Sequence, residues 1–405
     1  MVCGMIRFGR CAAIGALALL GLGALASAAR NASAEDPAPV PGVTQDSIKI
    51  GAFGPLTGPS YLGGKLAMNG AEVVFDEANA AGGIFGRKIT LLREDDRCDP
   101  AAAIAAVKKL IAQDQVFSIS GGSCSNAAVA AREEIEQAGL PWVVMTAVHD
   151  GITRPIAPNI FSPALTSTIE GEAQIAFAQK RGIKRLAMIA MHDSWGRSRY
   201  EPLMAMLKEK GIALVDDEEM APDANDATPQ VLRLRAANPD AILVILFPKP
   251  AAAFVRDAAK FGFKPLLIGQ SGIADPVAFE EQVAMPGATA NFVTISQVRY
   301  TPESPEVDKW RKAIETKYPN DRLSVYNLFG VGHAQVVVEV LKRAGPDLTR
   351  QKFLDAIMTL RDFPTDTYGA GITCTKAENR CNKAPVFIQK EVGGPVRIVD
   401  ITKVD

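Results

Sequence analysis

The sequence has 405 residues, of which 48 % are hydrophobic and 22 % are charged, and its formal net charge at pH 7 is −1. This length is sufficient for two lobes of ordinary domain size, each with its own hydrophobic core. A chain so close to neutrality lacks the basic excess that is typical of nucleic-acid-binding proteins, so we expect no nucleic-acid partner.

The N-terminal residues 1–34 have the pattern of a secretory signal peptide. Two arginines precede an apolar run over residues 11–25, and this run ends in small residues. Such a segment directs export and is then removed, which predicts a periplasmic location. Cleavage after Ala28 and cleavage after Ala34 both fit the pattern. The proline-containing residues 35–45 are predicted to form a flexible lead-in.

Strand-like and helix-like stretches alternate along the next part of the chain. Strands are predicted to begin at Ser47, Arg87, Val116 and Pro141. Helices are predicted near 62–79, 99–112 and 125–137. Strands that are separated by helices of this length favour a parallel sheet with helices on both faces.

The alternation restarts after residue 161. Strands are predicted to begin at Arg185, Ala213, Ala241, Pro265 and Asn291. Helices are predicted near 169–181, before Gly211, and near 230–237 and 251–261. The two runs predict the α/β class with two doubly wound, Rossmann-like lobes. In that fold, ligands bind beyond the carboxyl ends of the strands.

The cysteines predict disulfides. Four of the six cysteines remain after removal of the signal, and an even number in an oxidising compartment favours disulfides over zinc. Cys374 and Cys381 bracket a short polar loop and form a natural local pair, which leaves Cys98 with Cys124. No C-x-x-C pair occurs, and the acidic residues around Cys98 are explained by a strand end and a helix start. We expect no metal site.

Glycine-rich turns follow several of the predicted strands and lead into helices. The clearest is S-G-G-S-C-S-N at residues 120–126. Free backbone N–H groups and the positive end of the helix dipole at such a turn suit an anion. The chain contains neither a phosphate-binding glycine motif nor a G-x-S-x-G nucleophile motif at these turns. We therefore expect no enzymatic activity and no cofactor, and a carboxylate is the simplest ligand.

Several stretches of the chain resemble the branched-chain amino-acid-binding family of ABC-transporter periplasmic proteins. They include I-K-I-G-A-F-G-P-L-T-G, M-N-G-A-E-V-V-F-D-E-A-N-A-A-G-G-I-F-G-R-K-I and E-D-D-R-C-D-P-A-A-A-I-A-A-V-K-K-L-I. The likeness continues through H-D-S-W-G and F-V-R-D-A-A-K-F-G-F to the C-terminal region. It therefore spans essentially the whole mature chain.

The resemblance implies a type I periplasmic binding fold, in which two lobes joined by three hinge crossings close on a small solute. The N-terminal lobe would comprise residues 46–162 and about 297–372. The C-terminal lobe would comprise residues 163–296 and about 373–405. The resemblance also implies a monomer, an ABC permease of the inner membrane as partner, and the same Cys98–Cys124 disulfide.

The family's carboxylate site carries over only in part. In amino-acid binders of this kind, hydroxyl and N–H groups just after the second cysteine hold the ligand carboxylate, which implies Ser125 and Asn126 here. A neighbouring turn usually supplies a second hydroxyl. In this chain the turn reads Ala147, Val148 and His149, so Val148 replaces the hydroxyl and an imidazole is gained.

The family's ammonium-binding glutamate would fall at Ser271, and Trp195 replaces the usual tyrosine of the second lobe. A buried ammonium group without a carboxylate partner is costly, so this pocket disfavours amino acids. We predict a carboxylate without a free amine, either an aromatic acid or a 2-oxo acid. Further candidate contacts are Tyr61, His192 and Phe247. The alternatives are a branched-chain or other amino acid as ligand or, in another functional class, a ligand-sensing receptor subunit.

Overall fold

The computed structural model describes residues 39–58 and 60–404. The predicted signal peptide, residues 1–34, lies outside the described residues. No helix in the described part of the chain is both long and apolar enough to cross a membrane.

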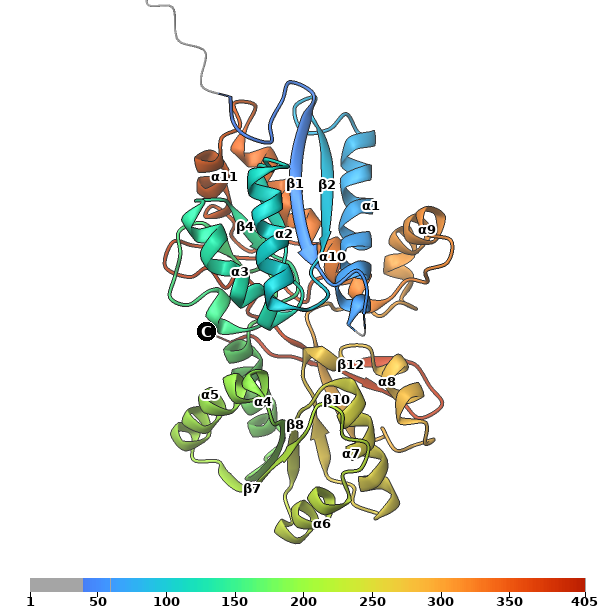
Figure 1. Ribbon diagram of the computed structural model, residues 1–405. Coiled ribbons are helices and arrows are strands. Elements are labelled where there is room, and N and C mark those ends of the chain that lie inside the picture. The colour runs from blue at the N-terminus through green and yellow to red at the C-terminus, as the bar shows by residue number, and fades with distance from the viewer. Residues whose placement is uncertain (1–38, 59, 405) are drawn as a thin grey trace, which may run out of the picture. The chain divides into compact units, whose positions relative to one another are not determined.

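The first lobe is built on a parallel sheet of five strands in the order β2-β1-β3-β4-β5 (Figure 1). The strands are β1 (Ser47–Gly54), β2 (Lys88–Asp95), β3 (Ser118–Gly121), β4 (Trp142–Val144) and β5 (Ile160–Phe161). Their helices are α1 (Ala67–Ala80), α2 (Pro100–Ala112), α3 (Ser125–Gln137), α9 (Asp308–Lys317), α10 (Val325–Ala344) and α11 (Arg350–Ile357). A π-helical turn (Leu62–Leu66) precedes α1, and 3-10 turns occupy Asp150–Ile152 and Pro305–Val307.

Side chains of β1 alternate between two hydrophobic cores, as expected for a strand covered on both faces. Ile48 and Ile50 join the core that contains α1 and α10. Phe53 joins the core that contains α2 and α3. The first sheet is therefore a central layer between two helical layers.

The second lobe is built on a sheet of seven strands in the order β12-β11-β10-β9-β8-β6-β7. The strands are β6 (Arg185–Met191), β7 (Ala213–Met220), β8 (Ala241–Ile245), β9 (Leu266–Ile268), β10 (Phe292–Ser296), β11 (Val386–Lys390) and β12 (Val396–Ile401). The helices are α4 (Ser167–Lys180), α5 (Ser194–Lys210), α6 (Thr228–Ala237), α7 (Pro248–Lys260) and α8 (Pro276–Val283), with a 3-10 turn at Ser271–Ile273. Strand β11 is antiparallel to β10 and β12. Strands β11 and β12, near the C-terminus, were not predicted from the sequence.

Three segments connect the two sheets, and they lie side by side. The segment after β5 pairs with the segment before β11, since Ser162 donates to Asn379 O (2.8 Å) and Cys381 donates to Ser162 O (2.7 Å). The segment after β10 joins them through a hydrogen bond from Arg299 N–H to Thr367 O (2.8 Å). The predicted lobe boundaries near residues 162, 296 and 373 stay predictions. The predicted fold class, two doubly wound lobes with three crossings, is confirmed.

Two disulfides are present, Cys98–Cys124 and Cys374–Cys381, in the pairing that the sequence analysis predicted. The first ties the loop after β2 to the residue that precedes α3. The second lies on the last crossing, where both cysteines are buried in the core around α10. The first disulfide therefore anchors the start of α3, and the second anchors a connection between the lobes.

Candidate functional site

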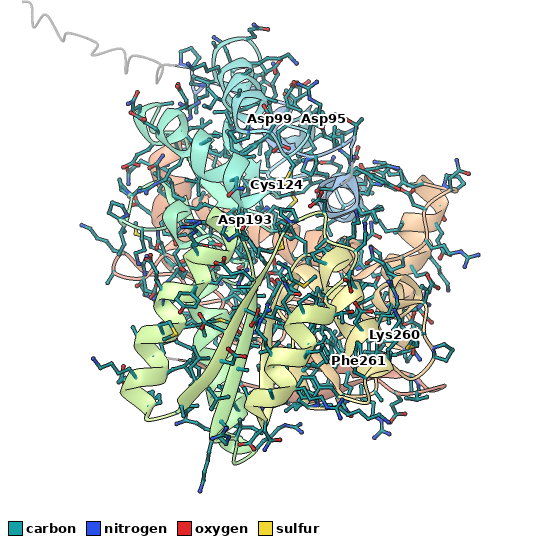
Figure 2. The ribbon with its side chains drawn as sticks, turned by 60° about the horizontal axis from the view of Figure 1, so that its bottom comes forward. Asp95, Asp99, Cys124, Asp193, Lys260 and Phe261 are labelled. Carbon is teal, nitrogen blue, oxygen red and sulfur yellow. A yellow bond between two sulfur atoms is a disulfide. The ribbon has the colours of Figure 1, made fainter. Side chains whose placement is uncertain are left out.

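A cavity of about 720 Å³ lies at the carboxyl ends of strands from both sheets. Its walls come from the loops after β1, β3 and β4 in the first lobe, and from the loops and helix starts after β6, β8 and β9 in the second. Figure 2 labels Cys124 and Asp193, the residues that precede α3 and α5, near the middle of the view. Both lobes therefore contribute side chains to one site, as the fold predicts.

The start of α3 forms the first-lobe wall. Its N-cap residue, Cys124, makes no side-chain capping hydrogen bond, and Ser125 and Asn126 both line the cavity. The Ser125 hydroxyl accepts a hydrogen bond from Val148 N–H (3.3 Å), which joins α3 to the turn after β4. Because the first N–H groups of a helix have no partners within the helix, this wall can receive an anion.

The backbone around this wall depends on Gly122. Its φ is +89°, and a Cβ there would lie 2.9 Å from the indole of Trp142. The Gly122 carbonyl accepts hydrogen bonds from the N–H groups of Thr146 and Ala147 (3.1 and 3.0 Å). The turn that carries Val148 is therefore held by the glycine loop, and the Thr146 residue of that turn lines the cavity.

The second-lobe wall is aromatic. Trp195, which is 5 % exposed, stacks on Phe247 with ring centroids 4.5 Å apart, and both rings line the cavity. The guanidinium carbon of Arg199 lies 4.6 Å from the Trp195 ring on the same helix. The start of α5 is capped by Asp193, which accepts from Gly196 N–H (2.8 Å). These contacts fix the orientation of the indole.

A buried ion pair adjoins this wall. Arg199 Nη1 donates to Glu170 Oε2 (2.6 Å), and the two side chains are 3 % and 0 % exposed. The Ser271 hydroxyl, on a residue that lines the cavity, donates to the other oxygen of Glu170. Both carboxylate oxygens of Glu170 are therefore engaged within the protein.

Two further polar residues line the cavity from opposite lobes. Asp275 precedes α8, and its carboxylate accepts from Ala278 N–H (3.1 Å). Burial raises its pKa. Tyr326 lies in the first turn of α10, and burial raises the pKa of its hydroxyl to about 12, with a further contribution from the Asp275 charge. Asp275 therefore contributes a carboxylate group to the cavity wall.

Five of the predicted contact residues line the cavity: Ser125, Asn126, Trp195, Phe247 and Ser271. The other four, Ala147, His149, Tyr61 and His192, do not belong to the lining. The His149 Nδ1 accepts from Gly151 N–H (2.9 Å) and caps a 3-10 turn, and burial lowers the pKa of this imidazole. The imidazole of His192 is exposed and pairs with Glu219. A direct ligand contact from any of the nine stays a prediction.

The cavity lining also contains residues that were not predicted from the sequence, among them Arg199, Asp275, Thr146 and Tyr326. A local signal was available for Arg199, because it follows Trp195 by four residues and so lies on the same face of α5. Tyr326 joins the site only through the packing of α10, so no local pattern marks it.

Within the described residues, no group of three or more histidine, cysteine or acidic side chains is arranged to hold a metal ion. The acidic residues near Cys98 instead accept hydrogen bonds from neighbouring loop and helix-start groups. Asp95 accepts hydrogen bonds from Leu56 N–H (2.8 Å) and the Thr57 hydroxyl (2.5 Å), and Asp99 caps α2 through Ala102 N–H (2.8 Å).

Comparison with known proteins identifies the family. Residues 47–394 match the family described as "Periplasmic binding protein". The chain is 29 % identical to Leu/Ile/Val-binding protein homolog 7 of Brucella abortus over 313 residues, which cover 73 % of this chain and 77 % of the relative. It is 26 % identical to homolog 8 of the same organism over 353 residues, which cover 83 % and 86 %.

Solved structures share the fold. The branched-chain amino acid transporter substrate-binding protein LivJ from Streptococcus pneumoniae, in complex with isoleucine, has a TM-score of 0.75 at 21 % identity, covering 89 % of this chain and 100 % of its own. A fatty acid ABC transporter substrate-binding protein from Thermomonospora curvata has a TM-score of 0.76 at 22 % identity, covering 90 % and 95 %. The chain therefore belongs to the periplasmic binding protein family, the non-enzymatic substrate-binding proteins of ABC transporters.

Proposed function

We propose that this chain, exported to the periplasm, captures a small carboxylate in the cavity between its lobes and delivers it as a monomer to an ABC permease of the inner membrane. The observation that carries this proposal is the start of α3. It lies on the cavity wall without a side-chain cap, and the Ser125 hydroxyl is held beside it by Val148. A carboxylate there would gain hydrogen bonds from free N–H groups and the favourable end of the helix dipole.

Branched-chain amino acids are the first candidates for this carboxylate. Two relatives that align with this chain over 313 and 353 residues are named Leu/Ile/Val-binding protein homologues. Asp275 supports this assignment, because its carboxylate lines the cavity and could accept hydrogen bonds from a ligand ammonium group.

A carboxylate without an amine, such as an aromatic acid or a 2-oxo acid, is the second candidate. Ser271 occupies the position that the family resemblance assigns to the ammonium-binding glutamate, and its hydroxyl already donates to Glu170. The stacked Trp195 and Phe247 rings offer an apolar wall that suits a planar or branched hydrocarbon group.

A matched pair of ligands distinguishes the two candidates. Leucine and 4-methyl-2-oxopentanoate share a carboxylate and a hydrocarbon tail and differ at the second carbon. Isothermal titration calorimetry of the ligand-free protein is expected to show binding of one or both, with phenylacetate as the aromatic probe. Native mass spectrometry of the protein as purified would identify any retained solute. The proposal fails if none of these carboxylates binds and no acid is released from the purified protein.

The Ser125→Ala substitution tests the carboxylate site directly. Loss of one hydrogen bond to a charged group is expected to weaken binding about tenfold to hundredfold. Ser60→Ala is the matched control, because Ser60 also lines the cavity but is exposed and belongs to the loop after β1. An equal loss of affinity in both variants, or no loss in Ser125→Ala, would contradict the assignment.

A further inference from the structure

We propose that Arg199 forms a second ligand subsite, which receives an oxygen acceptor of the solute in addition to the carboxylate held at α3. The ligand would then be an acid with a second carbonyl or carboxylate oxygen. Of the two candidates above, this inference favours the 2-oxo acid over a branched-chain amino acid, whose remainder offers no such oxygen. This inference rests on the proposed capture of a carboxylate, and it adds the chemistry of the ligand's other end.

Arg199 is placed for contact with a solute. It lies on α5, one turn after Trp195, and it belongs to the residues that line the 720 Å³ cavity. Its side chain is 3 % exposed and is held from two directions, by the ion pair with Glu170 and by the Trp195 ring. The guanidinium is therefore fixed in orientation before a ligand arrives, which lowers the entropic cost of binding.

The donors of Arg199 are used unequally. Nη1 donates to Glu170, whereas Nε and Nη2 are buried and have no hydrogen-bond partner in the part of the chain that the structure describes. Nε–H and Nη2–H point along the same edge of the guanidinium plane, and this edge is the one that matches two lone pairs of a carboxylate or carbonyl group. Buried donors without partners are costly, so a group that supplies an acceptor to this edge gains binding energy.

Because Arg199 and Glu170 form an ion pair without net charge, the oxygen acceptor of the ligand can be either neutral or negatively charged. Glu170 already balances the guanidinium charge, and its two oxygens are occupied by Arg199 and Ser271. A ketone oxygen would complete the hydrogen bonds without adding charge. A carboxylate would form stronger hydrogen bonds but would add one negative charge, which the exposed Lys249 at the cavity rim could partly offset.

An exclusively structural role for Arg199 makes a different prediction. If the guanidinium serves only to neutralise Glu170, removing it affects every ligand of the cavity by the same factor. If its free edge contacts the ligand, removing it affects only ligands that carry the second oxygen. The ratio of affinities within a matched pair therefore separates the two roles.

Two pairs of acids provide this ratio. Pentanoate and pentanedioate differ by replacement of a terminal methyl group with a carboxylate. The acids 4-methylpentanoate and 4-methyl-2-oxopentanoate differ only by a ketone oxygen. In the unsubstituted protein, calorimetry is expected to show the oxygenated member of at least one pair binding about tenfold to hundredfold more tightly. The pair that shows the preference tells whether the acceptor is charged or neutral.

The variants separate a loss of ligand contact from a loss of folding. Arg199→Met is expected to abolish the preference within the pair, and Arg199→Lys to retain only part of it. Because Arg199→Met leaves Glu170 without its cation, the double variant Arg199→Met with Glu170→Gln removes both charges and serves as the folded comparison, checked by circular dichroism. Ser125→Ala is the control: it should weaken both members equally and leave their ratio unchanged.

Two results would overturn the inference: equal affinities within both pairs in the unsubstituted protein, or a preference that persists in the double variant. If simple carboxylates or leucine still bind in either case, the carboxylate site at α3 stands and only the Arg199 subsite falls. If no carboxylate binds at all, the proposed function falls with it.

Discussion

Asp96 is a buried carboxyl group whose ionisation affects the stability of the fold. Its side chain is fully buried beside the Cys98–Cys124 disulfide, one oxygen accepts from Cys98 N–H (2.8 Å), and the other has no partner among the described residues. Burial raises the pKa of Asp96 to about 6, against the hydrogen bond from Cys98, which favours the charged form. The folded protein therefore binds a proton here more tightly than the unfolded chain does.

The sign of the resulting pH dependence follows from linkage. A carboxyl group with a raised pKa in the folded state destabilises the fold above pH 6, and this penalty disappears as the pH falls toward 4. We expect Asp96→Asn to raise the free energy of unfolding at pH 7 by up to about 3 kcal/mol, and to leave it nearly unchanged at pH 4. Urea unfolding at the two pH values measures this difference. A gain that is equal at both pH values would contradict it.

The packing of α1 against α10 supports the cavity, because Tyr326 lies in the first turn of α10 and lines the cavity wall. Gly70 and Gly330 allow the close approach of these helices: a Cβ on Gly330 would lie 1.8 Å from the Ala67 carbonyl oxygen, and one on Gly70 would lie 2.0 Å from the Asn327 carbonyl oxygen. Asn327 also donates to Leu66 O (2.8 Å), which ties the start of α10 to the turn before α1.

We expect Gly330→Ala to lower the free energy of unfolding by about 1–3 kcal/mol or more, because the added methyl group forces the two backbones apart. Thermal unfolding followed by circular dichroism measures the effect. Gly63→Ala is the matched control, since the nearest atom to its Cβ would lie 4.0 Å away. Similar losses in the two variants would show that close helix packing is not the cause.

At the scale of the whole molecule, the crossings connect the lobes and the turn after β4 contacts the start of α4. Val148 O accepts from Ser167 N–H (2.7 Å) and from the Ser167 hydroxyl (3.0 Å), and Asp150 accepts from Thr168 N–H (2.9 Å). The residues that line the cavity are thereby linked to the start of the second lobe. A ligand that contacts both walls would favour the closed arrangement of the lobes over an open one.

We therefore expect the radius of gyration of the ligand-free protein to decrease when a bound carboxylate saturates the cavity. Small-angle X-ray scattering of the same sample with and without ligand measures this change, and Ser125→Ala should require a higher ligand concentration to reach it. An unchanged radius of gyration at saturation would mean that binding does not close the lobes.

Periodicity, turn residues and cysteine spacing are local properties of the chain. They were sufficient to predict the alternation of strands and helices, the two lobes, the disulfide pairing and the position of the α3 start. The predicted glycine-rich turn contains Ser125, whereas Trp195 and Ser271 became candidates through the family resemblance, and all three line the cavity.

The contacts that these residues make could not be predicted from local patterns, because they form only when distant parts of the chain pack together. Glu170 is 29 residues from Arg199 and 101 residues from Ser271, yet hydrogen bonds join the three side chains. No spacing along the chain encodes such a contact, because it arises when α4, α5 and the loop after β9 pack on one sheet. For the same reason the unpaired edge of Arg199, on which the ligand's second group depends, became visible only in the folded chain.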